Sequence, residues 1–315
     1  MDILTALWII VAPVALFALA AVVISFFLTR RHYLVETRSP AEVGLAFENI
    51  AFPASDGVLL RGWWIPAPGS DRAIIQMHGH GGSMDPDVQY LPAWHAAGFN
   101  VLAFDFRAHG RSEGRAITFG YLERRDVQGA VRFLKQEKGM RRIALVGFSL
   151  GGMVAILSAP VCPEVDAVVE DGAPARIRSA VAVWATERGL PLWMGKVMAW
   201  MAVFGASLRL GVNLFHYEPA RRIGEIAPRP LMIIHGELDQ YCPDFEDLLA
   251  ATGARHLPAE HASRSAPHGA NASPLHEPSH TTEVWRIPDV GHVQGSQVYP
   301  EEFRKRIVDF LNQHL

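Results

Sequence analysis

The chain has 315 residues, half of them hydrophobic, and its 29 basic and 32 acidic residues give a formal net charge of −3. After an apolar N-terminal segment, roughly 280 residues are left, enough for one large α/β domain or two small ones. The small charge, and the lack of basic runs interleaved with aromatic residues, argue against a nucleic-acid partner. The two cysteines, Cys162 and Cys242, are too few for a disulfide framework, and we expect free thiols.

The N-terminal residues 3–28 are apolar and contain no charged residue, and about 20 such residues in a helix span a bilayer. A cleaved signal peptide is the alternative, but it would carry basic residues before a shorter apolar region. Here only Asp2 precedes the segment, whereas Arg30 and Arg31 follow it. We therefore expect a retained single-pass anchor. With Arg38, these arginines predict that the rest of the chain faces the cytoplasm.

Beyond this anchor, assigned to residues 1–31, and a juxtamembrane linker at 32–46, the pattern predicts one α/β domain over 47–315. Residues 46–67 predict two strands joined by a hairpin turn at Asp56-Gly57. Short apolar strands then alternate with helical stretches such as residues 122–138, which is typical of a mostly parallel sheet with helices on both faces. The predicted strands are residues 73–77, 101–106, 143–148, 167–170, 230–235 and 284–287.

Two segments interrupt this alternation. Residues 176–215 are apolar and rich in Trp and Met, and they predict a cap of two or three short helices. Trp184 of this cap is a candidate for substrate contact, although an ordinary packing layer would have the same composition. Residues 253–280 are rich in Ala, Ser, Pro and His without periodicity, which predicts an irregular surface loop.

The clearest chemical motif follows the strand at residues 143–148. Gly147-Phe148-Ser149-Leu150-Gly151 has the G-x-S-x-G pattern between a strand and a helix, where a serine occupies a strained turn. Glycines are needed on both sides because larger residues would collide with neighbouring backbone. Ser149 is therefore the predicted nucleophile, and a glycine-rich packing turn is the alternative.

A second glycine-rich stretch follows the strand at residues 73–77. His78-Gly79-His80-Gly81-Gly82 offers backbone N–H donors for a developing oxyanion, with His80 as the predicted donor and Leu150 as its partner. The pair His78 and His80 also suggests a metal site, but no third ligand stands at a suitable spacing. We expect no metal here.

Five motifs in order resemble the α/β-hydrolase superfamily, particularly its bacterial serine-aminopeptidase-like and esterase-like members. They are HGHGG (78–82), FDFRAHGRSEG (104–114), GFSLGG (147–152), HGELD (235–239) and GH (291–292). The resemblance implies an α/β-hydrolase fold over residues 47–315. It also implies a catalytic triad of Ser149, Asp239 and His292, the chain order that this fold uses.

Other acids compete for these roles. Glu237, Asp244 and Asp247 are rivals to Asp239, although solvated loop carboxylates are the simpler interpretation. Glu170 and Asp171 follow another strand end and are candidates for substrate contact or for a structural role. In similar proteins the stretch around Asp105, Arg107 and His109 is mainly structural.

The sequence therefore predicts a serine hydrolase that cleaves carboxylic esters without a metal or organic cofactor. An apolar cap and a membrane anchor favour hydrophobic, lipid-like acyl esters as the small-molecule substrate. Two alternatives stay open at this point. One is a peptidase or amidase of the serine-aminopeptidase type, which would need an acidic pair such as Glu170 and Asp171 to hold the substrate ammonium. The other is a membrane-tethered binding protein without turnover.

Overall fold

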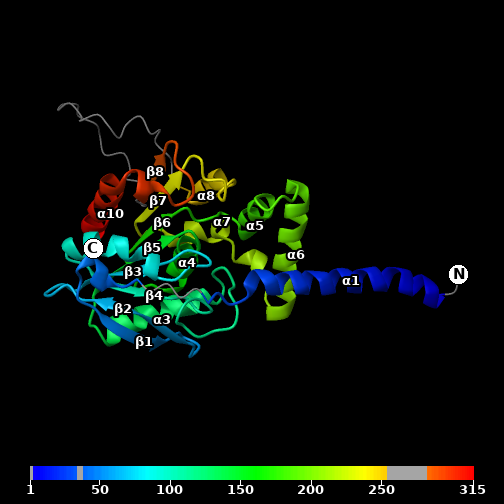
Figure 1. Ribbon diagram of the computed structural model, residues 1–315, viewed down its shortest axis with the longest axis horizontal. Helices are drawn as coiled ribbons and strands as arrows, with labels where there is room; N and C mark the ends of the chain where they lie inside the picture. Colours follow the sequence, from blue (N-terminus) through cyan, green and yellow to red (C-terminus); the bar gives the residue numbers. More distant parts are fainter. Residues whose placement is uncertain (1–2, 34–37, 254–281) are drawn as a thin grey trace.

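The computed structural model describes residues 3–33, 38–253 and 282–315, which form an eight-stranded sheet with helices on both faces (Figure 1). The strand order is β1-β2-β4-β3-β5-β6-β7-β8. Strand β2 is antiparallel to both of its neighbours, and the remaining neighbouring pairs are parallel. The strands are β1 (Glu48–Pro53), β2 (Leu59–Ile65), β3 (Arg72–Met77), β4 (Asn100–Phe104), β5 (Arg142–Phe148), β6 (Ala167–Asp171), β7 (Leu231–Gly236) and β8 (Thr282–Ile287).

Each face of the sheet has its own buried core. One core contains residues from α3, α4 and α8, and the other contains residues from α2 and α10. Neighbouring strand residues such as Val168 and Val169 enter opposite cores because side chains alternate along a strand. The helices are α1 (Ile3–Thr29), α2 (Leu91–Ala96), α3 (Glu123–Gln136), α4 (Leu150–Ser158), α5 (Ile177–Thr186), α6 (Leu192–Leu210), α7 (Pro219–Arg222), α8 (Phe245–Ala251), α9 (Gly295–Val298) and α10 (Pro300–His314).

The predicted α/β-hydrolase architecture is confirmed, and the six predicted parallel strands match β3 to β8 within two residues at each end. The predicted hairpin is β1–β2, with Gly57 at φ +88° in its turn. The prediction for the cap was wrong in one respect: α6 is a single helix of 19 residues, not a short one. The irregular loop predicted at residues 253–280 lies, apart from Gly253, outside the described residues.

Helix α1 projects from the molecule, and its C-terminal end is held on the α/β domain (Figure 1). Arg31 donates to the carbonyls of Gly114 and Gly110, both at 3.1 Å, and His32 N donates to Ala108 O at 2.9 Å. The region predicted as a linker is therefore partly packed against the domain. Residues 11–29 of α1 are long and apolar enough to cross a membrane, by length and composition.

Helix α6 runs across α1 and approaches it very closely (Figure 1). A Cβ atom added to Gly205 would lie 2.1 Å from the carbonyl oxygen of Ala21, so the contact requires glycine at this point. Arg209, near the end of α6, places its guanidinium 3.9 Å from the ring centroid of Phe26 and donates to Thr29 Oγ1. The N-terminal helix and the cap are thus one packed unit.

Replacing Gly205 tests this contact. We expect Gly205→Val to destabilise the detergent-solubilised protein by about 1–3 kcal/mol, since the new side chain forces α6 away from α1. Thermal unfolding measures the change. Leu208→Val is the control, because it places the same side chain on an exposed position of the same helix. Equal unfolding temperatures for the two variants would contradict the close crossing.

Candidate active site

Ser149 occupies a sharp turn between β5 and α4. Its backbone has φ 53° and ψ −110°, a conformation that is strained for a residue other than glycine. A Cβ atom at Gly147 would lie 2.2 Å from Gly151 O, and one at Gly151 would lie 2.1 Å from Met77 O. The two glycines are therefore required by close backbone packing, as the motif predicted. The turn places the serine side chain at the carboxyl edge of the sheet.

Two side chains from other loops meet this serine in a line. His292 Nε2 lies 2.8 Å from Ser149 Oγ, and His292 Nδ1 lies 2.7 Å from Asp239 Oδ2. The Asp239 side chain is fully buried, and its other oxygen accepts a hydrogen bond from Tyr241 N at 2.8 Å. In this geometry Asp239 fixes the Nδ1–H tautomer, which leaves the lone pair of Nε2 directed at the serine hydroxyl.

Gly172 is a contributor that the sequence reasoning missed. It follows β6 with φ +67°, and a Cβ atom there would lie 3.3 Å from both Asp239 Oδ2 and His292 Cε1. Any side chain would press on the carboxylate–imidazole pair. The sequence signal that could have identified Gly172 was a glycine just after the strand predicted at residues 167–170, next to Glu170 and Asp171.

The two predicted oxyanion donors both belong to segments next to the serine. Gly79, which precedes His80, is close enough that an added Cβ would be 3.6 Å from Ser149 Cβ. Leu150 is the first residue of α4, where the helix dipole favours negative charge. Among the described residues, neither the His80 nor the Leu150 backbone N–H has a hydrogen-bond acceptor. Both donors are available to a ligand.

Comparison with known proteins shows the family to which the chain belongs. The sequence pattern of the Alpha/beta hydrolase family matches residues 74–306, well over half of the chain. The chain belongs to the α/β-hydrolase family. The esterase Pf2001 of Pyrococcus furiosus has a similar structure, with a TM-score of 0.68 and 26% identity over 90% of this chain and 97% of that one.

Two bacterial relatives are also similar. The uncharacterized protein YfhR of Escherichia coli O157:H7 is 30% identical over 208 residues, which is 62% of this chain and 64% of the relative. The match therefore spans less than two thirds of that relative's length. The uncharacterized protein YqkD of Bacillus subtilis is 28% identical over 217 residues, 66% of this chain and 70% of the relative.

The histidines of the glycine-rich stretch in this α/β hydrolase are placed for packing. His78 Nε2 accepts a hydrogen bond from Phe106 N at 3.0 Å, so Nδ1 carries the proton and donates to Gly79 O at 2.8 Å. Both ring nitrogens are thus in use. The His80 ring stacks on Phe119 with centroids 5.1 Å apart. These contacts do not favour the metal interpretation of the H-G-H sequence.

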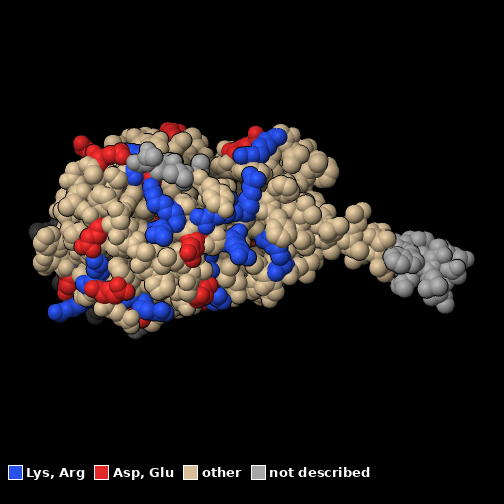
Figure 2. All heavy atoms as spheres, turned by 60° about the horizontal axis from the view of Figure 1, so that its bottom comes forward, with Lys and Arg blue, Asp and Glu red and all other residues tan. Residues whose placement is uncertain are grey.

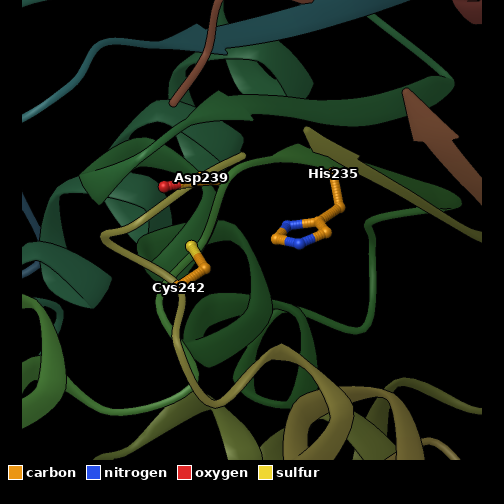
Figure 3. A group of neighbouring side chains, drawn as sticks. All are labelled: His235, Asp239 and Cys242. Carbon is orange, nitrogen blue, oxygen red and sulfur yellow. The ribbon is translucent and has the colours of Figure 1, made fainter. Parts of the chain in front are cut away.

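A second group of potential metal ligands surrounds the triad acid. His235, at the end of β7, lies close to Asp239 and Cys242 of the following loop, with one ligand atom of each within 4.8 Å of the others (Figure 3). Asp239 is already hydrogen-bonded to His292, and the Cys242 thiol donates to Gly172 O at 3.4 Å. Burial raises the pKa of Cys242 well above its usual value, which disfavours the thiolate that a metal needs. The group is better explained as packing beneath the triad.

Glu170 and Asp171 lie at the end of β6 and are almost fully buried. Glu170 accepts a hydrogen bond from Ala173 N at 2.8 Å, while Asp171 Oδ2 has no partner among the described residues. Burial, together with the nearby charge of Asp239, raises the pKa of Asp171 to about 8, and burial raises that of Glu170 well above its usual value. Burial therefore favours the neutral form of both carboxyls. Substrate contact by either residue stays a prediction.

The cap is fastened to the loop that carries Asp239. Glu187, just after α5, accepts hydrogen bonds from the Tyr241 hydroxyl and from Gln240 Nε2. Tyr241 in turn lies 5.0 Å from the His292 ring, measured between centroids. Trp184 of α5 is partly exposed, with the Arg188 guanidinium 3.8 Å from its ring centroid, and its contact with substrate stays a prediction.

The elevated pKa of Asp171 predicts a pH-dependent effect on stability. In the unfolded chain this carboxyl ionises near pH 4, whereas in the fold it stays protonated up to about pH 8. Its burial therefore costs more stability as the pH rises through that interval, by at most about 1.4 kcal/mol per pH unit. We expect Asp171→Asn to raise the unfolding temperature at pH 7.5 and to change it little at pH 4.

The Asp71→Asn variant is the control, since the Asp71 side chain is exposed and lacks the burial that Asp171 has. A gain for Asp171→Asn that does not change between pH 4 and pH 8 would show that this carboxyl is ionised in the fold.

Proposed function

We propose that the protein is a serine hydrolase that cleaves hydrophobic carboxylic esters through an acyl-enzyme on Ser149. One observation carries the proposal: Asp239, His292 and Ser149 are hydrogen-bonded in a line, at 2.7 and 2.8 Å. This arrangement can deprotonate a hydroxyl at neutral pH. The esterase of Pyrococcus furiosus among the structural neighbours supports the ester as the bond cleaved.

The mechanism has two half-reactions, and in each of them His292 first takes a proton and then gives it away. Ser149 Oγ attacks the ester carbonyl carbon while His292 Nε2 takes the hydroxyl proton, and Asp239 stabilises the resulting imidazolium. The N–H groups of His80 and Leu150 hold the oxyanion. His292 then gives the proton to the departing alcohol. In the second half-reaction water attacks the acyl carbonyl carbon while His292 Nε2 takes one of its protons. The C–O bond to Ser149 then breaks, His292 returns that proton to Ser149 Oγ, and the carboxylic acid leaves.

We also propose that α1 anchors this hydrolase in a membrane, with the catalytic domain on the cytoplasmic side. The length and hydropathy of residues 11–29 support the span. Arg30 and Arg31 directly after the helix support the orientation, because basic residues flank the cytoplasmic end of a span.

The aminopeptidase alternative loses its main support. It needs an ionised acidic pair to bind an ammonium group, and Glu170 and Asp171 are buried with raised pKa values. A binding protein without turnover would need neither the strained Ser149 turn nor the hydrogen-bonded His292, and such strain persists only where the surrounding structure enforces it.

Turnover of p-nitrophenyl esters tests the ester proposal. We expect kcat/KM of the wild-type protein to rise from acetate through butyrate to octanoate, since longer chains bury more apolar area. Asp239→Asn should lower kcat by about three to four orders of magnitude because the wrong imidazole tautomer would face Ser149.

Glu237→Gln is the matched control, because Glu237 is an exposed carboxylate of the same loop. Its kcat should equal that of the wild type. An equal loss in both variants, or turnover of amides but not of esters, would contradict the proposal.

A further inference from the structure

The cap helix α6 exposes mainly apolar side chains, with Lys196 as a charged residue beside them on its exposed side. Only Lys196 and Arg209 are charged among its 19 residues. Trp193 is 68% exposed and Val197 is 50% exposed, and Trp200 continues the same stripe at i, i+4 and i+7. A helix that is apolar all round is normally buried in protein or in lipid, so this exposed stripe requires a partner.

The opposite side of α6 carries small residues that pack within the protein. Ala202 and Ala206 are buried, and Gly205 meets the backbone of Ala21. A Cβ atom at Gly195 would lie 2.7 Å from Ala182 O of α5. The rotation of α6 is therefore fixed by these contacts, and its stripe of large apolar residues is held outward.

The contacts with α1 show the direction in which this stripe points. Phe17 precedes the close crossing at Ala21, and its ring centroid lies 6.1 Å from that of Trp200 and 6.3 Å from that of Phe204. The stripe thus faces the N-terminal part of α1, which is the part that projects from the molecule (Figure 1). The exposed surfaces of the two helices are continuous.

The position of the crossing along α1 fits a membrane surface. Helix α1 has 27 residues and measures about 40 Å at 1.5 Å per residue, more than the roughly 30 Å of a bilayer hydrocarbon core, so roughly its first 20 residues can span the core while the rest stands beyond it. Helix α6 contacts α1 at Phe17 and Ala21, near the end of that length, and then at Phe26 and Thr29 beyond it. Because α6 runs across α1, it lies along the membrane plane when α1 spans the bilayer (Figure 1).

The positions of the basic side chains also fit a membrane surface at this place. Lys and Arg side chains gather on the part of the globular domain next to the uncharged N-terminal extension (Figure 2). Arg209 of α6 covers Phe26, and Arg188 after α5 covers Trp184. Arginine beside an aromatic ring suits the boundary between lipid chains and headgroups.

We propose that α6 lies in the interface of the bilayer that α1 crosses, with Trp193, Val197 and Trp200 inserted among the lipid chains. The substrate is then an amphiphilic ester that reaches Ser149 from the same leaflet. This proposal rests on α1 being the membrane span of the proposed function. It adds a second, independent element of contact with lipid and a source for the substrate.

Helix α6 is connected to the active site through a series of direct contacts. Helix α6 packs on α5 at Gly195, and Glu187 after α5 is hydrogen-bonded to Tyr241 beside His292. At the other end of α5, Ser179 Oγ donates to Asp244 Oδ2 at 2.8 Å in the same loop. The loop that positions the triad acid is therefore fixed to the membrane-facing cap.

Nitroxide labels on full-length protein in phosphatidylcholine–phosphatidylglycerol nanodiscs test the insertion. Single labels are placed through Val197→Cys on α6, Val14→Cys on α1, and Val161→Cys, an exposed apolar position after α4 and outside the cap and α1. The native cysteines, Cys162 and Cys242, are buried, and the unsubstituted protein corrects for any label on them. Frequent collision of a nitroxide with oxygen shows that the label lies in lipid. Frequent collision with a water-soluble nickel chelate shows that it lies in water.

We expect the labels at 197 and 14 to favour oxygen and the label at 161 to favour nickel. The insertion of α6 is overturned if the label at position 197 collides with nickel as often as the label at position 161 does. If the label at position 14 still favours oxygen in that case, the membrane anchor stands. Nickel contact at both 197 and 14 overturns the anchor as well. The readout does not depend on turnover, so a failure of the esterase proposal is seen separately.

A kinetic measurement tests the substrate source. We expect Val197→Glu to lower the ratio of turnover of a vesicle-embedded ester to turnover of a dissolved short ester by about tenfold, since inserting a valine side chain contributes more than 1 kcal/mol. Val161→Glu should leave this ratio at the wild-type value. An unchanged ratio in Val197→Glu overturns delivery from the leaflet.

Discussion

The strained turn at Ser149 fixes the position of the other groups in the site. Its backbone is held at φ 53° by the hydrogen bond from Ser149 N to Asp171 O at 2.8 Å and by the contact of Gly147 with the start of α4. Such a conformation costs about 1–3 kcal/mol and persists only where the surrounding packing enforces it. The same turn directs Oγ toward His292 and places Leu150, the proposed oxyanion donor, at the start of α4.

Close packing extends this constraint to the acid and the base. Gly236 ends β7, and a Cβ atom there would lie 2.3 Å from Val290 O, so the loops after β7 and β8 are in direct backbone contact. Asp239 and His292 are carried by these two loops. Burial raises the pKa values of Glu170 and Asp171, which favours the neutral forms of these two carboxyls near the His292–Asp239 pair. The packing of these loops therefore orients Asp239 and His292, and burial of the neighbouring carboxyls sets the charge around them.

The sequence predicted the sheet and the turn at Ser149 because both depend on short local patterns, whereas Asp239 and His292 were named through the family resemblance. Apolar runs mark the strands, and Gly147, Ser149 and Gly151 stand within five residues. The contacts that were missed join distant segments: Gly205 with Ala21, and Glu187 with Tyr241. Nothing in either segment alone specifies its partner. The length of α6 was missed because an apolar cap gives no periodicity from which to place its ends.

Covalent labelling tests the central claim most directly. The full-length protein is treated with a fluorophosphonate, its intact mass is measured, and the modified peptide is sequenced. The proposed function predicts one phosphonyl group per chain, attached to Ser149, and no adduct in a folded Ser149→Ala variant. A folded wild-type protein that stays unmodified, or an adduct on a different residue, would contradict the assignment of Ser149 as the nucleophile.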